Sequence, residues 1–142
     1  MPVSFDMENN SVADLRISPL QASLTAALLS NHGIMPVPRI AMAVNTPQQG
    51  WVVLSDKSQS VDVIQAQAAD DTALSFIEDG KPYWSHVGQA NVDDETVITW
   101  LLAGTLPDWG GIPLVLVVEL EEDNAVLAKK IGIDILDTAL NK

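Results

Sequence analysis

The sequence predicts an α+β fold, with an antiparallel sheet of at least three C-terminal strands and helices packed on it. Three observations support this prediction. A capped helix with an apolar stripe comes first, three strand-like segments follow one another over short links, and an amphipathic helix ends the chain. Short links favour antiparallel neighbours, because a parallel connection needs a crossover of a dozen or more residues.

The first helix is predicted over 19–31. Ser18 is a capping residue, a proline follows it at the first helical position, and Gln21 completes a capping box. Gly33 provides a left-handed C-cap, and His32 beside it is expected to interact with the last carbonyl groups of the helix. An apolar stripe at helical spacing is formed by Leu20, Leu24, Ala27 and Leu28.

The middle of the chain carries weaker signals. Residues 34–50 are rich in proline and are interpreted as extended. Residues 51–54 are interpreted as a short strand, and residues 55–60 as a polar loop. The segment 61–79 combines strand-like alternation with a helical apolar pattern, and we favour a helix over 68–78.

The C-terminal half gives stronger signals. Strands are predicted over 83–90 and 96–103, joined by an acidic turn. A near-continuous aliphatic run over 113–120 is typical of a strand buried on both faces. Acidic residues then lead into a final helix, because the helix dipole favours negative charge there. The predicted buried face of that helix consists of Ala128, Ile131, Ile135 and Ala139, with Leu136 and Leu140 beside it.

Length and composition restrict the class of protein. The 142 residues suit one domain over 15–142, preceded by a polar lead-in over 1–14. A hydrophobic content of 47% excludes a disordered acidic tail. The formal net charge of -12 repels nucleic-acid phosphates and anionic lipids, so we expect no nucleic-acid partner.

The residue inventory excludes further classes. The chain has no cysteine, which rules out disulfides, thiol catalysis and cysteine-bound metals. No apolar run approaches the ~20 residues of a spanning helix, and residues 1–10 lack the features of a signal peptide, so this chain is expected to be soluble. No cofactor and no metal are expected. The carboxylates at 70–71, 93–95 and 119–123 are interpreted as solvated, with weak calcium binding at 93–95 as the alternative.

Three segments carry patterns that occur together in one family. SPLQ at 18–21 begins an Ala/Leu-rich helix, YWSHVGQA at 83–90 forms a strand, and TWLLAG at 99–104 is followed by IPLVLVVE at 112–119 and a last helix. In this order the segments resemble the C-terminal part of the transpeptidase domain of penicillin-binding proteins. The second segment resembles the strand that carries the family's Lys-Thr-Gly-Thr-Ala motif.

The resemblance implies a serine acyl-transferase fold of the β-lactamase type in a longer parent protein. It also implies a parent on the extracytoplasmic face of a bacterial membrane, with peptidoglycan stem peptides or β-lactams as its ligands. The family's nucleophile lies in a Ser-x-x-Lys motif and its second signature is Ser-x-Asn, and both precede the matched region. Neither motif is present in these 142 residues. We therefore expect a C-terminal region with no catalytic residue of its own.

The resemblance also identifies candidate site residues. His86, Val87, Gly88 and Gln89 align with the Lys, Thr, Gly and Thr of the family motif. In the family the lysine and threonine side chains hold a substrate carboxylate, and the fourth main-chain N–H helps to form the oxyanion hole. Gln89 retains such an N–H, whereas Val87 has no hydroxyl and His86 is only partly charged near neutral pH. The alternative for His86 is a polar residue on a strand of a decayed site.

Two other arrangements compete with this interpretation. A Ser85–His86 dyad is rejected, because adjacent side chains of a strand point to opposite faces. A sugar-stacking groove competes with core packing for the four tryptophans, and packing is favoured for Trp100. The four are Trp51, Trp84, Trp100 and Trp109.

Two further functional hypotheses stay open. One is a non-catalytic binding or scaffolding module derived from the same fold, and the other is an unrelated α+β interaction domain. A region separated from a larger fold exposes apolar surface, so we expect patches over 20–28 and 112–118 and self-association through them.

Overall fold

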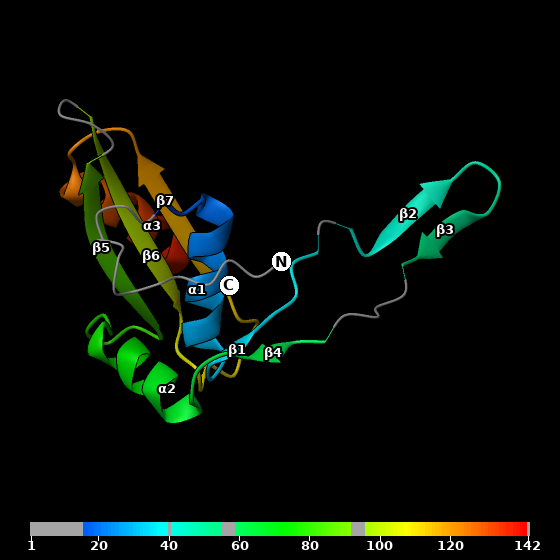
Figure 1. The fold of residues 1–142 in the computed structure, drawn as a ribbon, viewed down its shortest axis with the longest axis horizontal. Helices are drawn as coiled ribbons and strands as arrows, with labels where there is room; N and C mark the ends of the chain where they lie inside the picture. The colour runs from blue at the N-terminus through cyan, green and yellow to red at the C-terminus, as the bar shows by residue number, and fades with distance from the viewer. Residues whose placement is uncertain (1–15, 40, 55–58, 92–95, 142) are drawn as a thin grey trace, which may run out of the picture.

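The computed structural model describes residues 16–39, 41–54, 59–91 and 96–141 (Figure 1). The predicted lead-in over 1–14 lies outside these residues, as do most of the predicted polar loop and acidic turn. Within the described residues the fold is α+β, with three helices and three antiparallel sheets. The predicted α+β class is therefore confirmed, and so is the sheet of three C-terminal strands.

The largest sheet consists of β5 (Tyr83–Asn91), β6 (Val97–Thr105) and β7 (Val115–Leu120), in that order and antiparallel. β6 lies in the middle, where its Leu102 pairs with His86 of β5. The three strands lie within one or two residues of the predicted segments. Their β-branched and aliphatic residues suit a pleated surface that is packed on both sides.

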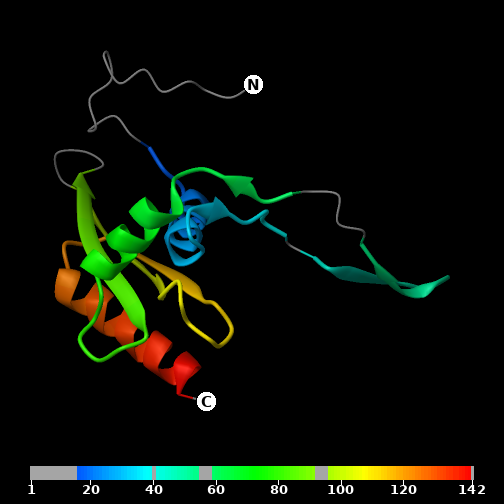
Figure 2. The same ribbon diagram turned by 90° about the horizontal axis from the view of Figure 1, so that it is seen from below.

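The core forms two clusters, one on each face of this sheet, because successive side chains of a strand point to opposite faces. The first cluster lies under α3 (Ala125–Leu140) and contains Tyr83, Leu101, Ala103, Ala128 and Leu136. The second lies under α1 (Pro19–Ser30) and α2 (Ala66–Ser75) and contains Ala26, Ala73 and Trp84. Figures 1 and 2 show α1 and α3 on opposite faces of the sheet.

Helix α1 begins as predicted but turns a different face to the sheet. The Ser18 hydroxyl accepts a hydrogen bond from the Gln21 N–H at 3.3 Å, and the Ser18 N–H donates to the Gln21 side chain at 2.8 Å, so the capping box is present. The predicted leucine stripe is only partly right, since Leu20 is 59% exposed. Small residues allow a closer approach to the sheet, and the buried side chains are those of Ala22, Ala26, Leu28 and Ser30.

The C-terminal end of α1 confirms the predicted left-handed turn. Gly33 has a φ of 79° and its N–H donates to the Leu28 carbonyl at 3.0 Å. A Cβ at Gly33 would clash with the Ile64 carbonyl, which explains why glycine is required there. The neighbouring His32 is also left-handed, with a φ of 52°.

Helix α3 shows the same preference for small residues. The predicted face is wrong at Ile135 and Ala139, which are exposed, because the residues in contact with the sheet follow the i, i+4 row. That row consists of Ala128, Gly132 and Leu136. Within the described part of the chain, no helix is long and apolar enough to cross a membrane.

β7 differs from the expectation of a strand buried on both faces. Val115 and Glu119 are exposed, and the other residues of β7 are half-buried. Helices α1 and α3 both contact the strand, but β7 is an edge strand among the described residues. The central strand β6 holds the most deeply buried positions instead, and a run of aliphatic residues alone does not distinguish these two places in a sheet.

The chain between α1 and α2 forms two hairpin pairings. β1 (Ile34–Met35) pairs with β4 (Val61–Asp62) beside the body of the molecule, and β2 (Ala43–Thr46) pairs with β3 (Gly50–Val53) further out. Figures 1 and 2 show β2 and β3 projecting away from the helices and the large sheet. We call residues 41–54 the arm.

The arm corrects one part of the sequence interpretation and confirms another. The strand predicted over 51–54 corresponds to β3. The segment 34–50 is extended as predicted, but it contains two strands whose partners the local sequence does not reveal. The helix favoured over 68–78 starts two residues earlier and ends at Ser75, because the chain then turns back along the sheet.

Candidate functional site

The candidate site lies at the outer edge of β5, where the four motif residues follow one another. Residues 76–78 return from α2 and pair with the first part of this edge, with Ile77 opposite Trp84. The Ser85 N–H donates to the Phe76 carbonyl at 3.0 Å. The Glu78 N–H donates to the Tyr83 carbonyl at 3.2 Å. These two bonds show that Tyr83 and Ser85 direct their main-chain polar groups away from β6.

The edge beyond Ser85 is open within the described part of the chain. Alternate residues of an antiparallel strand direct their main-chain groups to the same side, so Val87 and Gln89 also direct theirs away from β6. None of the described strands pairs with this side of β5 beyond Ser85. We call the outer side of residues 87–91 the open edge. It offers hydrogen-bond donors and acceptors to an extended ligand.

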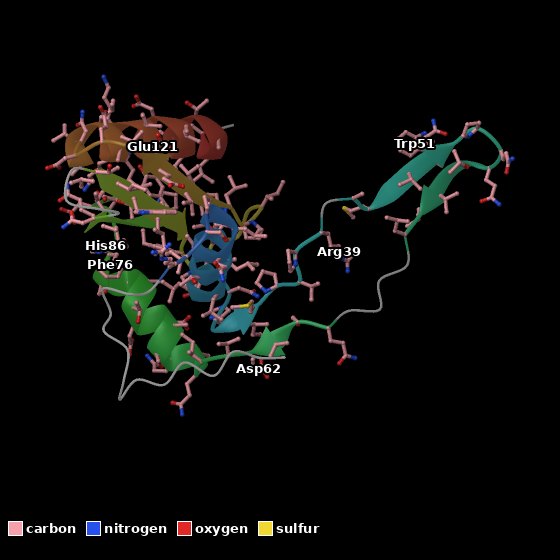
Figure 3. All side chains as sticks on the ribbon, turned by 45° about the horizontal axis from the view of Figure 1, so that its top comes forward. Arg39, Trp51, Asp62, Phe76, His86 and Glu121 are labelled. Atoms are coloured by element: carbon pink, nitrogen blue, oxygen red, sulfur yellow. The ribbon has the colours of Figure 1, made fainter. Side chains whose placement is uncertain are left out.

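His86 lies on the face of the sheet that carries α1 and α2. Its ring stacks on Phe76, with 4.4 Å between centroids and an interplanar angle of 39°. Figure 3 shows the two rings together at the end of α2. The His86 side chain is exposed, and a Cβ placed on Gly88 would meet no atom within 4 Å. None of the described residues therefore covers the surface of the sheet at Gly88, beside His86.

Val87 and Gln89 lie on the opposite face, under α3. Val87 packs against the cluster of Tyr83 and Leu101. The Gln89 side chain donates a hydrogen bond to Asp123, just before α3. The structure thus places the four predicted residues on one strand but divides their side chains between two faces. Among the four, only Val87 and Gln89 direct their main-chain groups to the open edge, because those of His86 and Gly88 are directed towards β6.

A polar cluster beside the open edge involves residues that the sequence analysis did not single out. The Ser85 hydroxyl donates to the Glu78 carboxylate at 2.5 Å, and the Lys129 ammonium lies 2.8 Å from the same carboxylate. Burial raises the pKa of Glu78, but the hydrogen bonds from Lys129 and Ser85 outweigh burial and bring that pKa below its ordinary value. A carboxylate held in this way is a weak general base, so the cluster fastens residues 76–78 to α3 rather than activating Ser85.

A second cluster joins the start of β5 to the last turns of α3. Asp137 accepts hydrogen bonds from Lys81 at 2.8 Å and from the Tyr83 hydroxyl at 3.0 Å. These bonds, with Lys81 contributing most, lower the pKa of Asp137. Burial, followed by the bond to Asp137, raises the pKa of Tyr83 to about 12. Both clusters join α3 to the start of β5, before the four motif residues.

The rejected Ser85–His86 dyad is absent for the predicted reason. Ser85 faces Glu78 on the α3 side, whereas His86 stacks on Phe76 on the other side. No signal in the local sequence marks Glu78 and Lys129 as partners of Ser85, because they are 7 and 44 residues away along the chain and meet only in the folded protein.

Other candidates occupy structural positions. The prediction for His32 is wrong, because its Nδ1 lies 3.0 Å from the carboxylate of Asp70 in α2 and does not bind the carbonyl groups of α1. Trp84 is buried in the core, where its indole N–H donates to the Ser30 hydroxyl at 3.0 Å. Trp51 lies on the arm, so the tryptophans do not line one groove. Among the described residues, no group of three or more His, Asp or Glu side chains is placed to hold a metal ion.

No protein-family model and no curated protein matches this chain.

Proposed function

We propose that this chain is the C-terminal region of a penicillin-binding, peptidoglycan transpeptidase-like protein with a fold of the β-lactamase type. The parent protein lies on the extracytoplasmic face of a bacterial membrane and binds a peptidoglycan stem peptide or a β-lactam. The chain itself contains neither Ser-x-x-Lys nor Ser-x-Asn, so it is not catalytic alone. Its role is to form one wall of the acyl-transfer site.

The observation that carries this proposal is the open edge at the altered motif. A main-chain N–H directed away from the sheet at Gln89 is what the fourth motif position must supply to an oxyanion hole, and any residue type can supply it. The small Gly88 leaves the adjoining surface uncovered. A single sheet between α1 and α3 also agrees with the arrangement that the resemblance implies.

The same geometry limits the chemistry that the wall can perform. His86 replaces the family's lysine with an imidazole ring, and that ring packs against Phe76. Val87 packs toward α3 and has no hydroxyl to donate. Carboxylate binding is therefore weaker than in the family, while the oxyanion donor is retained.

A second candidate is a non-catalytic binding or scaffolding module built on the same fold. The observation that favours it is the packing of the two altered motif residues. His86 lies on Phe76 and Val87 lies on the core, so both contribute to structure. In this alternative the parent protein has kept the fold and has lost acyl transfer.

The deciding experiment uses the native-length protein that contains this region. It is incubated with a fluorescent penicillin, and covalent labelling is read on a denaturing gel. A labelled band that disappears after prior heat denaturation supports the acyl-transfer proposal. A folded protein that gives no band favours the scaffolding module.

Variants then test whether the open edge takes part. Gly88→Val places a branched side chain on the uncovered surface, and we expect it to slow acylation at least roughly tenfold. Ile112→Ser changes an exposed residue away from this edge and serves as the control. Equal acylation rates for wild type, Gly88→Val and His86→Ala would show that the open edge takes no part in acyl transfer.

A further inference from the structure

The arm has an unpaired strand edge of its own, on the outer side of β3. The Leu54 N–H donates to the Met42 carbonyl at 2.9 Å, so residue 54 directs its main-chain groups towards β2. Val53 and Trp51 lie one and three residues before it, and they direct their main-chain groups away from β2. None of the described strands pairs with this side of β3.

This edge lacks the features that protect strand edges. Charged residues or a proline usually stop a further strand from pairing there. The sequence of β3 is Gly-Trp-Val-Val, and the arm as a whole contains no charged residue. Trp51 and Val53 are both largely exposed. The edge is therefore a short uncharged segment of high β-propensity, which favours pairing with another strand.

The distribution of charge favours a head-on meeting of two copies of the chain. Each copy has a formal net charge of -12, so two copies repel one another. The arm carries none of this charge, and it projects away from the helices and the large sheet (Figure 1). Two β3 strands that pair antiparallel come from opposite directions and keep the rest of the two molecules apart. Parallel pairing would bring the two charged bodies side by side.

The separation is sufficient to screen the repulsion. With a twofold axis at Val52, the base of each arm at Leu54 lies two residues from the axis, which is about 7 Å along a strand. The two bases are then about 14 Å apart, and the rest of each molecule lies further out. Salt at physiological ionic strength screens charges over about 8 Å.

The same register also matches the side chains. Trp51 lies opposite the partner's Val53, and Val53 lies opposite the partner's Trp51. Both residues are on one face of the hairpin, because they are two residues apart along the strand. An aromatic residue opposite a β-branched one is a favourable cross-strand pair, and each of these pairs exchanges two main-chain hydrogen bonds. The contact is self-complementary, as a closed dimer requires.

We propose that this chain forms a weak dimer in which the β3 strands of two copies pair antiparallel about a twofold axis at Val52. The two arms become one four-stranded sheet, which stabilises hairpins that are marginal alone. A contact of this size belongs to the weak, transient class, so we expect a dissociation constant of roughly 0.1–1 mM. The dimer does not depend on acyl transfer, and its failure is distinct from a failure of the proposed function.

Disulfide trapping tests the register in the full chain, which has no cysteine of its own. Val52→Cys and its control Val44→Cys each introduce a single thiol, on neighbouring strands of the arm. In the dimer the two Val52 positions form a non-hydrogen-bonded pair with Cα atoms about 4.5 Å apart, which a disulfide can bridge. The two Val44 positions are separated by both β3 strands, about 14 Å. Exposure alone would favour the control, because Val44 is exposed and Val52 is half-buried.

The rate of covalent dimer formation under mild oxidation is read on a non-reducing denaturing gel. We expect Val52→Cys to react at least roughly tenfold faster than Val44→Cys, because pairing raises the effective concentration of its thiols. In denaturing urea the two variants should react at equal rates. Equal rates in the folded chain, or a faster reaction of Val44→Cys, would overturn the proposal.

Lysine variants test the pairing without a covalent bond. Val52→Lys places like charges opposite one another across the axis, whereas Val44→Lys adds the same charge to the neighbouring strand. In sedimentation equilibrium the unmodified chain should associate more strongly as salt is added, because salt screens the repulsion between copies. Val52→Lys should abolish association and Val44→Lys should retain it. A monomer at every concentration up to about 1 mM, or equal association of the two variants, would overturn the proposal and leave the arm to a different partner.

Discussion

Tyr83 is the single tyrosine of the chain, so a tyrosine titration reports on this residue alone. Burial and the hydrogen bond to Asp137 raise its pKa from 10.0 to about 12. Above pH 10 an unfolded chain ionises this tyrosine while the folded chain keeps it protonated. The stability that Tyr83 contributes is therefore present below pH 10 and is lost as the pH rises towards 12.

The corresponding measurement is a tyrosinate absorbance titration. The folded chain should show a midpoint near 12 and the chain in denaturant a midpoint near 10. Asp137→Asn should lower the folded midpoint, because it removes the carboxylate charge beside the phenol. A folded midpoint that is equal to the denatured one would contradict the placement of Tyr83.

Ser30 provides the partner of a buried indole N–H. Ser30→Ala leaves the Trp84 N–H without an acceptor and should lower the free energy of unfolding by about 1–3 kcal/mol. Ser23→Ala in the same helix removes an exposed hydroxyl that bonds only to the Leu20 carbonyl, and it should be nearly neutral. Urea denaturation compares the two. The Ser30 effect should shrink in a Trp84→Phe background, where no N–H remains to be satisfied.

At the scale of elements, Gly132 controls how closely α3 approaches the sheet. A Cβ at this position would lie 2.6 Å from a methyl group of the buried Leu101. Gly132→Ala gains about 1 kcal/mol of helix propensity but overpacks the core, so we expect a net loss of roughly 1–2 kcal/mol.

A double-mutant cycle isolates this contact. Leu101→Val shortens the side chain that the added methyl group of Gly132→Ala would meet, so the cost of Gly132→Ala should be smaller in that background. Thermal unfolding of the four proteins provides the comparison. An unchanged or improved stability of the single Gly132→Ala variant would show that α3 can move away without cost.

At the scale of the whole molecule, the arm is the largest departure from a closed fold. Residues 41–54 contain no charged side chain, in a protein of net charge -12. Trp51 is 74% exposed and Val53 is 78% exposed on the same face of the hairpin. A two-stranded hairpin is marginally stable in water by itself, so this surface favours contact with another surface.

The arm therefore refines the expectation of self-association. The sequence placed the exposed patches over 20–28 and 112–118, where Leu20 and Ile112 are indeed exposed, but the arm adds a larger uncharged surface. We expect concentration-dependent association in sedimentation velocity, lowered more by Trp51→Ser with Val53→Thr than by Leu20→Ser with Ile112→Ser. A strict monomer at every concentration would contradict both sets of surfaces.

Local patterns in the sequence determined several features directly. The capping box at Ser18 follows from interactions between near neighbours, the left-handed turn was marked by Gly33, and the three C-terminal strands were marked by the β-branched and aliphatic residues of their segments. The four motif positions on one strand also follow from local pattern, and alternation correctly separated Ser85 from His86.

The tertiary structure alone decided which faces and edges are used. Size, not hydrophobicity, selected Ala26 and Gly132 as the contact residues of their helices, because close approach to the sheet leaves no room for larger side chains. The order of the strands made β7 an edge and left β5 open beyond Ser85 among the described residues. The clusters of Glu78 with Lys129 and of Lys81 with Asp137 join residues far apart in the chain, and only folding brings such charges together.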